Sequence, residues 1–272
     1  MKSTRSRSVH VTPAGTLLLA SALSLWSMSA FAQARAERFS DKEVKTLIDQ
    51  VYDSRDKFEG NLDGDFKGST LRGPTGETKV AGALQDYQDS CNKLKERFTD
   101  DYSGSSEVAT VLKQSTLIHE FMLAQPATMK GRPEWDRHVA NLKRLAGAYG
   151  TTFPFAVGGT ARRMNDKETS AVAEELAEAA NRFKSDLDKD AAIPKPDKDA
   201  AKKDVEALVK LADVVKSRTK DGKPATTEAR QLVEHVAKLR TFVGAHTIAP
   251  LTNWEAVQAS FGKLEQAFAL TQ

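Results

Sequence analysis

A spacing pattern built around tryptophan occurs twice in this chain and limits its fold more than any other feature. After Trp135 and after Trp254, the residues 3, 7, 10 and 14 positions later fall on one face of a helix. These positions hold His138, Leu142, Leu145 and Tyr149 in the first stretch and Val257, Phe261, Leu264 and Phe268 in the second. Each stretch is therefore predicted to be a helix whose tryptophan faces a core.

The match between the two halves extends upstream of the tryptophans. Ser40–Glu43 and Asn165–Glu168 each place a capping side chain three residues before a glutamate, which is typical of a helix N-terminus. Asn165 lies 125 positions after Ser40, and helical apolar stripes follow in both halves. The sequence after the first 32 residues therefore reads as one module of four helices that occurs twice.

Helices joined by short connections favour an up-down-up-down bundle, because consecutive helices then pack as antiparallel neighbours. The sequence predicts an all-α fold of two tandem up-down-up-down four-helix bundles that arose by internal duplication. The bundles are expected at 38–150 and 163–272, with a glycine-containing linker at 151–162. An alternative within the same class is one eight-helix array with a shared core.

The connection after the first helix of each module is where the two copies differ. The first copy has the glycine-rich stretch Gly64–Gly76, and the second has the shorter Pro/Lys stretch Ile193–Lys198. Loops absorb such length changes at little cost in stability. We find no strand pattern in the sequence, so both stretches are predicted to be loops.

The N-terminal segment has the organisation of a signal peptide. A basic start precedes the apolar run Thr16–Phe31, and Ala30-Phe31-Ala32 ends that run with a small-x-small cleavage pattern. The run is shorter than the roughly 20 residues that a membrane-spanning helix needs. We therefore predict a signal peptide at residues 1–32 and a periplasmic or secreted protein; an uncleaved anchor is the alternative.

Cleavage of the signal peptide changes the charge of the chain. The full sequence has a formal net charge of +3, which falls to 0 because the leader holds Lys2, Arg5 and Arg7 and no acidic residue. A balanced charge gives no electrostatic support for binding nucleic acid or anionic lipid. No nucleic acid is expected as a partner, and no stable membrane span is expected after cleavage. The single cysteine, Cys91, lies on a predicted apolar face and is expected in the core.

The sequence lacks the motifs of several common catalytic classes. It has no Gly-x-Ser-x-Gly, no His-Glu-x-x-His, no phosphate loop and no Cys-x-x-Cys-His. No histidine follows a glutamate by three positions, which excludes the di-iron signature of helical bundles. We therefore predict no catalytic residues and a non-enzymatic binding or interaction protein. Its partner, a protein or a small molecule, would use an exposed apolar helix face or the groove between the bundles.

Three residues of the first copy support an alternative function in metal or haem binding. His119 and Met122 lie near the end of the third predicted helix, and His138 lies near the start of the fourth, so antiparallel packing places them near one layer. Imidazole and thioether ligands suit copper(I) or a non-covalently bound haem iron. However, a histidine on an apolar face is more commonly a hydrogen-bonded core residue. The second copy supports that reading, since its residues at these positions are Arg240, Val243 and Val257.

Overall fold

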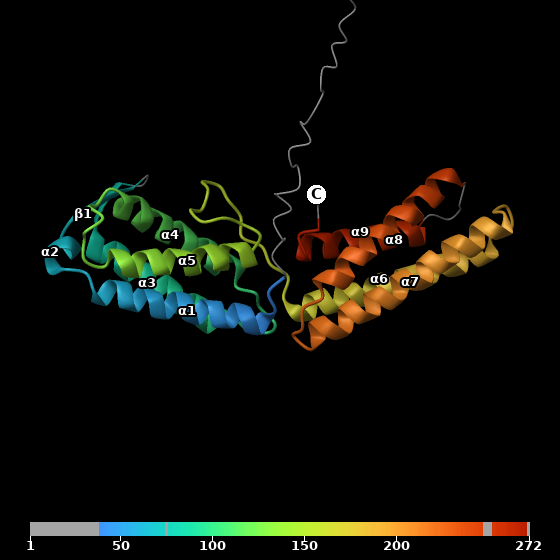
Figure 1. The fold of residues 1–272 in the computed structure, drawn as a ribbon, viewed down its shortest axis with the longest axis horizontal. Coiled ribbons are helices and arrows are strands. Elements are labelled where there is room, and N and C mark those ends of the chain that lie inside the picture. The colour runs from blue at the N-terminus through green and yellow to red at the C-terminus, as the bar shows by residue number, and fades with distance from the viewer. Residues whose placement is uncertain (1–37, 74–75, 247–251, 271–272) are drawn as a thin grey trace, which may run out of the picture. The chain divides into compact units, whose positions relative to one another are not determined.

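The computed structural model describes residues 38–73, 76–246 and 252–270, and the predicted signal peptide at 1–32 lies outside these ranges. The described residues form nine helices and one two-stranded antiparallel sheet, so the all-α prediction is confirmed (Figure 1). In chain order the elements are α1 (Asp41–Gly60), α2 (Gly64–Lys67), β1 (Thr70–Gly73), β2 (Gly76–Lys79), α3 (Val80–Arg97), α4 (Ser105–Leu123), α5 (Arg132–Ala148), α6 (Asp166–Lys189), α7 (Lys195–Lys220), α8 (Thr226–Ala245) and α9 (Thr252–Ala267).

Helices α1, α3, α4 and α5 form the first helical set. Helix α1 packs against α3 and α5, and α4 packs against the same two helices. The predicted capping box is present at the start of α1, where Ser40 and Glu43 each accept the backbone N–H of the other. Trp135 is 1% exposed in the core of this set, and its ring lies 4.8 Å from the Phe58 ring, centroid to centroid. The predicted inward orientation of Trp135 is thus confirmed.

Helices α6, α7, α8 and α9 form the second helical set, around a separate buried cluster. Helix α6 packs against α7 and α9, and α8 packs against the same two helices. Trp254 is 4% exposed and lies 5.3 Å from Phe183, centroid to centroid. Because Phe183 follows Phe58 by 125 positions, each tryptophan packs on the residue that the repeat register assigns to it. Cys91 belongs to the first cluster as expected, at 2% exposure.

Two connections differ from the predicted loops. The stretch after α1 contains α2 and a hairpin in which Leu71 of β1 lies opposite Thr78 of β2. Leu71 is fully buried in the first cluster, whereas every residue of β2 is exposed, so Leu71 is the side chain through which the hairpin contacts the core. In the second copy, α7 begins inside the predicted loop at Lys195. Proline is compatible with the first turn of a helix, and Pro196 lies in that turn.

The segment predicted as a linker, 151–162, forms no helix but packs on the first helical set. Phe153 and Ala161 are 6% and 7% exposed within the first cluster. The Phe155 N–H donates to Thr116 Oγ1 of α4 at 2.8 Å, and the Arg162 N–H donates to the Tyr149 carbonyl at 3.0 Å. These contacts place Arg162 and the following residues at the end of α5.

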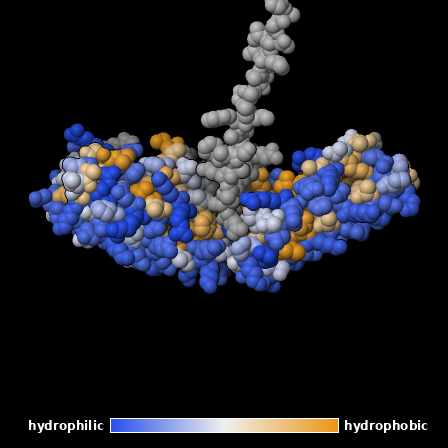
Figure 2. Space-filling view, in the orientation of Figure 1, coloured by the Kyte–Doolittle hydropathy of each residue, from blue (hydrophilic) through white to orange (hydrophobic). Residues whose placement is uncertain are grey.

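The visible surface of both helical sets is mainly hydrophilic (Figure 2). The large hydrophobic residues that are exposed among the described residues lie in four different segments: Tyr102, Leu123, Val157 and Val214. Scattered single residues of this kind are ordinary on a protein surface and do not form an apolar patch. Within the described ranges, every helix is too short or too polar to cross a bilayer.

Candidate functional site

His138 lies in the core of the first helical set and bonds to two hydroxyl groups. It is fully buried, with Nδ1 at 2.8 Å from Ser54 Oγ and Nε2 at 2.7 Å from the Tyr87 hydroxyl. Burial, and to a smaller extent the nearby Arg55 charge, lowers its pKa from 6.5 to about 3. The imidazole is therefore neutral, and both of its nitrogens are in hydrogen bonds.

The other two predicted metal-binding residues have different surroundings. His119 is half-buried, and its Nδ1 accepts the indole N–H of Trp135 at 3.1 Å. The Trp135 ring contacts both imidazoles, with centroids 6.1 Å from His119 and 5.3 Å from His138. Met122 is fully buried in the first cluster. Metal binding by His138 would have to break a bond to Ser54 or to Tyr87, and the described residues contain no group of three His, Cys, Asp or Glu side chains placed to hold a metal ion.

The buried polar network consists of the buried Tyr87 and His138 together with Ser54, which is half-buried at its edge. The donors and acceptors around Ser54 assign its protons. Ser54 Oγ lies 2.6 Å from the Gln50 carbonyl, which can only accept, so the hydroxyl proton points there. The Asn141 amide donates to Ser54 Oγ at 3.1 Å. His138 Nδ1 then donates to Ser54, and Nε2 accepts from Tyr87, whose pKa is raised well above 10 by burial. All three members are satisfied in this arrangement.

This proton arrangement disfavours catalysis by Ser54. A serine nucleophile needs a base with a free lone pair beside its hydroxyl. Here the nitrogen next to Ser54 carries the proton, and a pKa of about 3 makes His138 a weak base. The buried polar network is therefore a structural element of the core.

In the second helical set, apolar residues occupy the positions that correspond to Ser54, Tyr87 and His138. Helix α6 follows α1 by 125 positions, α7 follows α3 by 121, and α9 follows α5 by 119. The counterparts of Ser54, Tyr87 and His138 under these shifts are Ala179, Leu208 and Val257. All three counterparts are buried and apolar, so the module packs a core without these polar groups.

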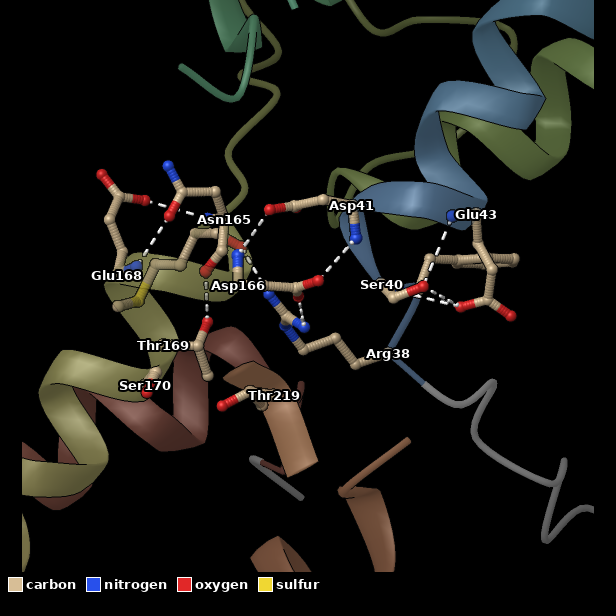
Figure 3. Close-up of polar contacts among 12 residues, drawn as sticks. Arg38, Ser40, Asp41, Glu43, Asn165, Asp166, Glu168, Thr169, Ser170 and Thr219 are labelled. Atoms are coloured by element: carbon tan, nitrogen blue, oxygen red, sulfur yellow. Dashed lines mark hydrogen bonds and ion pairs between the residues drawn. The ribbon is translucent and has the colours of Figure 1, made fainter. Parts of the chain in front are cut away.

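A second polar arrangement, the junction cluster, joins the starts of α1 and α6. It consists of Arg38, Asp41, Arg163 and Asp166. The Asp41 N–H donates to Asp166 Oδ2 at 2.8 Å, and the Asp166 N–H donates to Asp41 Oδ2 at 2.8 Å (Figure 3). Each aspartate thus accepts an N–H that lies in the first turn of the other helix and has no partner within its own helix.

The two arginines of the junction cluster repeat the same symmetry. Arg38 donates to Asp166 at 2.6 Å and to the Met164 carbonyl at 2.8 Å. Arg163 donates to Asp41 and, at 2.8 Å, to the Phe39 carbonyl. Arg163 follows Arg38 by 125 positions, and the acceptors of Arg163, Asp41 and Phe39, precede those of Arg38, Asp166 and Met164, by the same number. The junction therefore has a local pseudo-twofold relation between the starts of α1 and α6.

Burial sets the electrostatics of the junction cluster. The side chains of its four members are between 3% and 14% exposed. Burial raises the pKa of the Asp41 carboxyl, and burial together with the Arg163 charge lowers the pKa of Arg38. Two cations and two anions balance there, so the cluster holds charge in a poorly solvated place without a net excess.

A groove of about 640 Å³ lies beside the junction cluster. Arg38, Phe39, Arg163 and Met164 from the two helix starts contribute to its wall together with Arg162, and the rest comes from α6, from the start of α4 and from the ends of α5 and α9. Several lining residues are again related by the repeat: Ala148 with Ala267, and Gly150 with Ala269. Its volume lies within the range of about 300–1,000 Å³ that is typical of small-molecule pockets. We call this feature the junction groove.

Sequence reasoning did not single out the junction cluster. The arginine–aspartate spacing was visible in both copies, at Arg38 and Asp41 and at Arg163 and Asp166. Charged residues at a helix start are usually solvated, so nothing local marked these as buried. The signal available in the sequence was that an arginine three residues before an aspartate recurs 125 positions later. Comparison with protein-family models, curated proteins and solved structures gave no match to this chain.

Proposed function

We propose that this chain is an exported, non-enzymatic binding protein, and that its ligand is a small molecule held in the junction groove. The observation that carries this proposal is the groove itself, about 640 Å³ in volume beside four buried charges. Ligand pockets occur preferentially where two packed units meet, and they combine apolar walls with a few fixed polar groups. The junction groove has these properties.

The proposal includes an architecture of two tandem up-down-up-down four-helix bundles from an internal duplication. Each helical set has a closed cycle of neighbouring helices and its own buried cluster. The reciprocal contacts of Asp41 and Asp166 support descent of both sets from one module. Export rests on the signal-peptide pattern of residues 1–32, which gives a periplasmic or secreted location.

A non-enzymatic role is supported by the protonation of the buried polar network. Ser54 and His138 are the pair that most resembles a nucleophile and its base, and the proton lies on the wrong nitrogen for that chemistry. Binding of copper(I) or haem by His119, Met122 and His138 stays a prediction, since it requires the hydrogen bonds of His138 to be exchanged for a metal bond.

Native mass spectrometry tests the proposed function on the mature protein, purified from the compartment to which it is exported. Wild type is expected to carry an additional small-molecule mass that unfolding releases. A171W should abolish this mass, because Ala171 is an exposed residue of α6 that lines the junction groove. A200W is the matched control, since Ala200 is an exposed residue of α7 outside the groove. A mass that survives in A171W would place the ligand elsewhere.

A further inference from the structure

Four of the six charged residues that line the junction groove form ion pairs within the protein. Arg38 pairs with Asp166, and Arg163 pairs with Asp41. Lys263 pairs with Glu175 at 3.0 Å. The remaining acid, Glu168, accepts the Asn165 N–H in the capping box of α6. The protein therefore supplies a counter-charge for four of the six charged residues of the wall, and the fifth, Glu168, is held in a helix cap.

Arg162 is the exception. Its backbone N–H bonds to Tyr149, but its exposed guanidinium has no ion-pair or hydrogen-bond partner among the described residues. The neighbouring Arg163 adds an unused donor, because its buried Nε has no hydrogen-bond partner within the part of the chain that the structure describes. The groove thus has one exposed guanidinium without a partner among the described residues and, on the next residue, one unpaired N–H.

Apolar side chains form the rest of the wall. Phe39 and Met164 are partly buried at the two helix starts, and Val172 and Phe268 are 6% and 4% exposed. An apolar group placed against these side chains would remove their remaining surface from water, which is the main source of affinity in such pockets. The groove therefore offers an apolar wall and one cationic position.

We propose that the ligand of the junction groove is a monoanionic amphiphile, with its acid group on Arg162 and its hydrocarbon part along Phe39, Met164 and Phe268. A guanidinium binds a carboxylate through two parallel hydrogen bonds, which fixes the orientation of the ligand as well as its charge. This inference rests on the proposed function and specifies the chemical class of its ligand. The ligand is then a free single-chain carboxylate in solution.

Isothermal titration calorimetry of the mature full chain with decanoate tests this assignment. We expect saturable binding of decanoate, no binding of decyltrimethylammonium, and loss of decanoate binding in A171W. Arg162→Gln should weaken decanoate binding about fivefold, the upper end of the loss expected for one exposed ion pair. R240Q is the matched control, because Arg240 is an exposed arginine of α8 outside the groove, and its affinity should equal that of wild type.

Several results would overturn the proposal. Equal decanoate affinity of R162Q and wild type would show that the acid group does not bind Arg162. Binding of decyltrimethylammonium would show that the groove does not select the charge of its ligand. Binding to phosphatidylglycerol vesicles without binding to free decanoate would make the ligand a membrane surface. If decanoate fails to bind while a co-purified mass is lost in A171W, the ligand class is wrong and the proposed function stands. If decanoate fails to bind and the mature protein carries no co-purified mass that A171W removes, both proposals fail.

Discussion

Ser54, Tyr87 and His138 show how much a few polar side chains in a core depend on one another. Each hydrogen bond in the network satisfies a group that is costly to bury alone, since an unpaired buried donor or acceptor costs about 1–3 kcal/mol. Removal of one member leaves its partners unpaired, whereas joint replacement of all three by apolar residues leaves nothing unsatisfied. The second helical set contains that joint replacement, as Ala179, Leu208 and Val257.

We therefore predict strong coupling among these three positions. S54A/Y87L/H138V should be more stable than the sum of the three single substitutions implies, with a coupling of about 1–3 kcal/mol. H138V alone should cost about 3–5 kcal/mol, because it orphans the Tyr87 hydroxyl and leaves a cavity. Urea denaturation of the four variants measures these energies. Additive costs would mean that the network contributes no cooperative stability.

The low pKa of His138 makes stability depend on pH in a definite direction. Its pKa is about 3 in the folded chain and about 6.5 when unfolded, so below pH 6.5 the unfolded state takes up a proton that the folded state refuses. This contribution is complete above pH 6.5 and is lost as the pH falls toward 3. By pH 5 the loss should be about 2 kcal/mol. The difference in unfolding free energy between wild type and S54A/Y87L/H138V, measured from pH 7 to pH 5, isolates it from the other histidines; a constant difference would contradict the assignment.

Sequence spacing predicted the residues that act within one helix better than those that act between helices. The capping pairs at Ser40 and Asn165 need only a helix start and a glutamate three residues later. His138 was placed on an inward face by the same local rule, but its partners Ser54 and Tyr87 lie on other helices. No local pattern distinguishes a histidine bonded to two hydroxyls from one that binds a metal, so that choice required three-dimensional positions.

The long helices and the hairpin differ in how strongly the sequence encodes them. Each long helix has an apolar stripe that recurs over several turns, which is why the helical part of the fold was predictable. The hairpin has strands of four residues and one buried side chain, Leu71, so alternation is too short to recognise. Its stability comes from packing on the first helical set and not from its own pairing, because a lone two-stranded hairpin is marginal in water.

Leu71 is thus predicted to carry most of the free energy that holds the hairpin. L71A should destabilise the protein by about 2–5 kcal/mol, the usual cost of truncating a fully buried leucine. L123A is the matched control, since Leu123 is 58% exposed at the end of α4 and its truncation should cost less than about 0.5 kcal/mol. Thermal or urea denaturation compares the two. Equal small effects would mean that the hairpin is not anchored through Leu71.

At the scale of the whole molecule, the junction cluster is the polar link between two separately packed cores. Asp41 and Asp166 each neutralise a buried arginine and accept an N–H from the opposite helix start. Loss of either carboxylate removes the main ion pair of a buried guanidinium, which costs about 3–5 kcal/mol. The main contacts of the two aspartates correspond, but Asp166 also lies 4.0 Å from Arg163, so D166A should cost as much as D41A or up to about 1 kcal/mol more. A large inequality in urea denaturation would show that the pseudo-twofold contacts are not energetically equivalent.

The junction cluster should also make the two helical sets unfold together. In protein produced without residues 1–32, Trp135 and Trp254 are the remaining tryptophans, one in each core, so W254F leaves a fluorescence probe in the first set alone. Circular dichroism of the same variant follows the helices of both sets. With the junction intact, the fluorescence and dichroism curves in urea should coincide, as expected for one cooperative transition.

In D41A/D166A/W254F the two curves should separate, because each set then unfolds according to its own core. Curves that stay coincident in that variant would mean that the sets are coupled by contacts other than these two carboxylates, and curves that differ even in W254F would mean that the junction does not couple them at all.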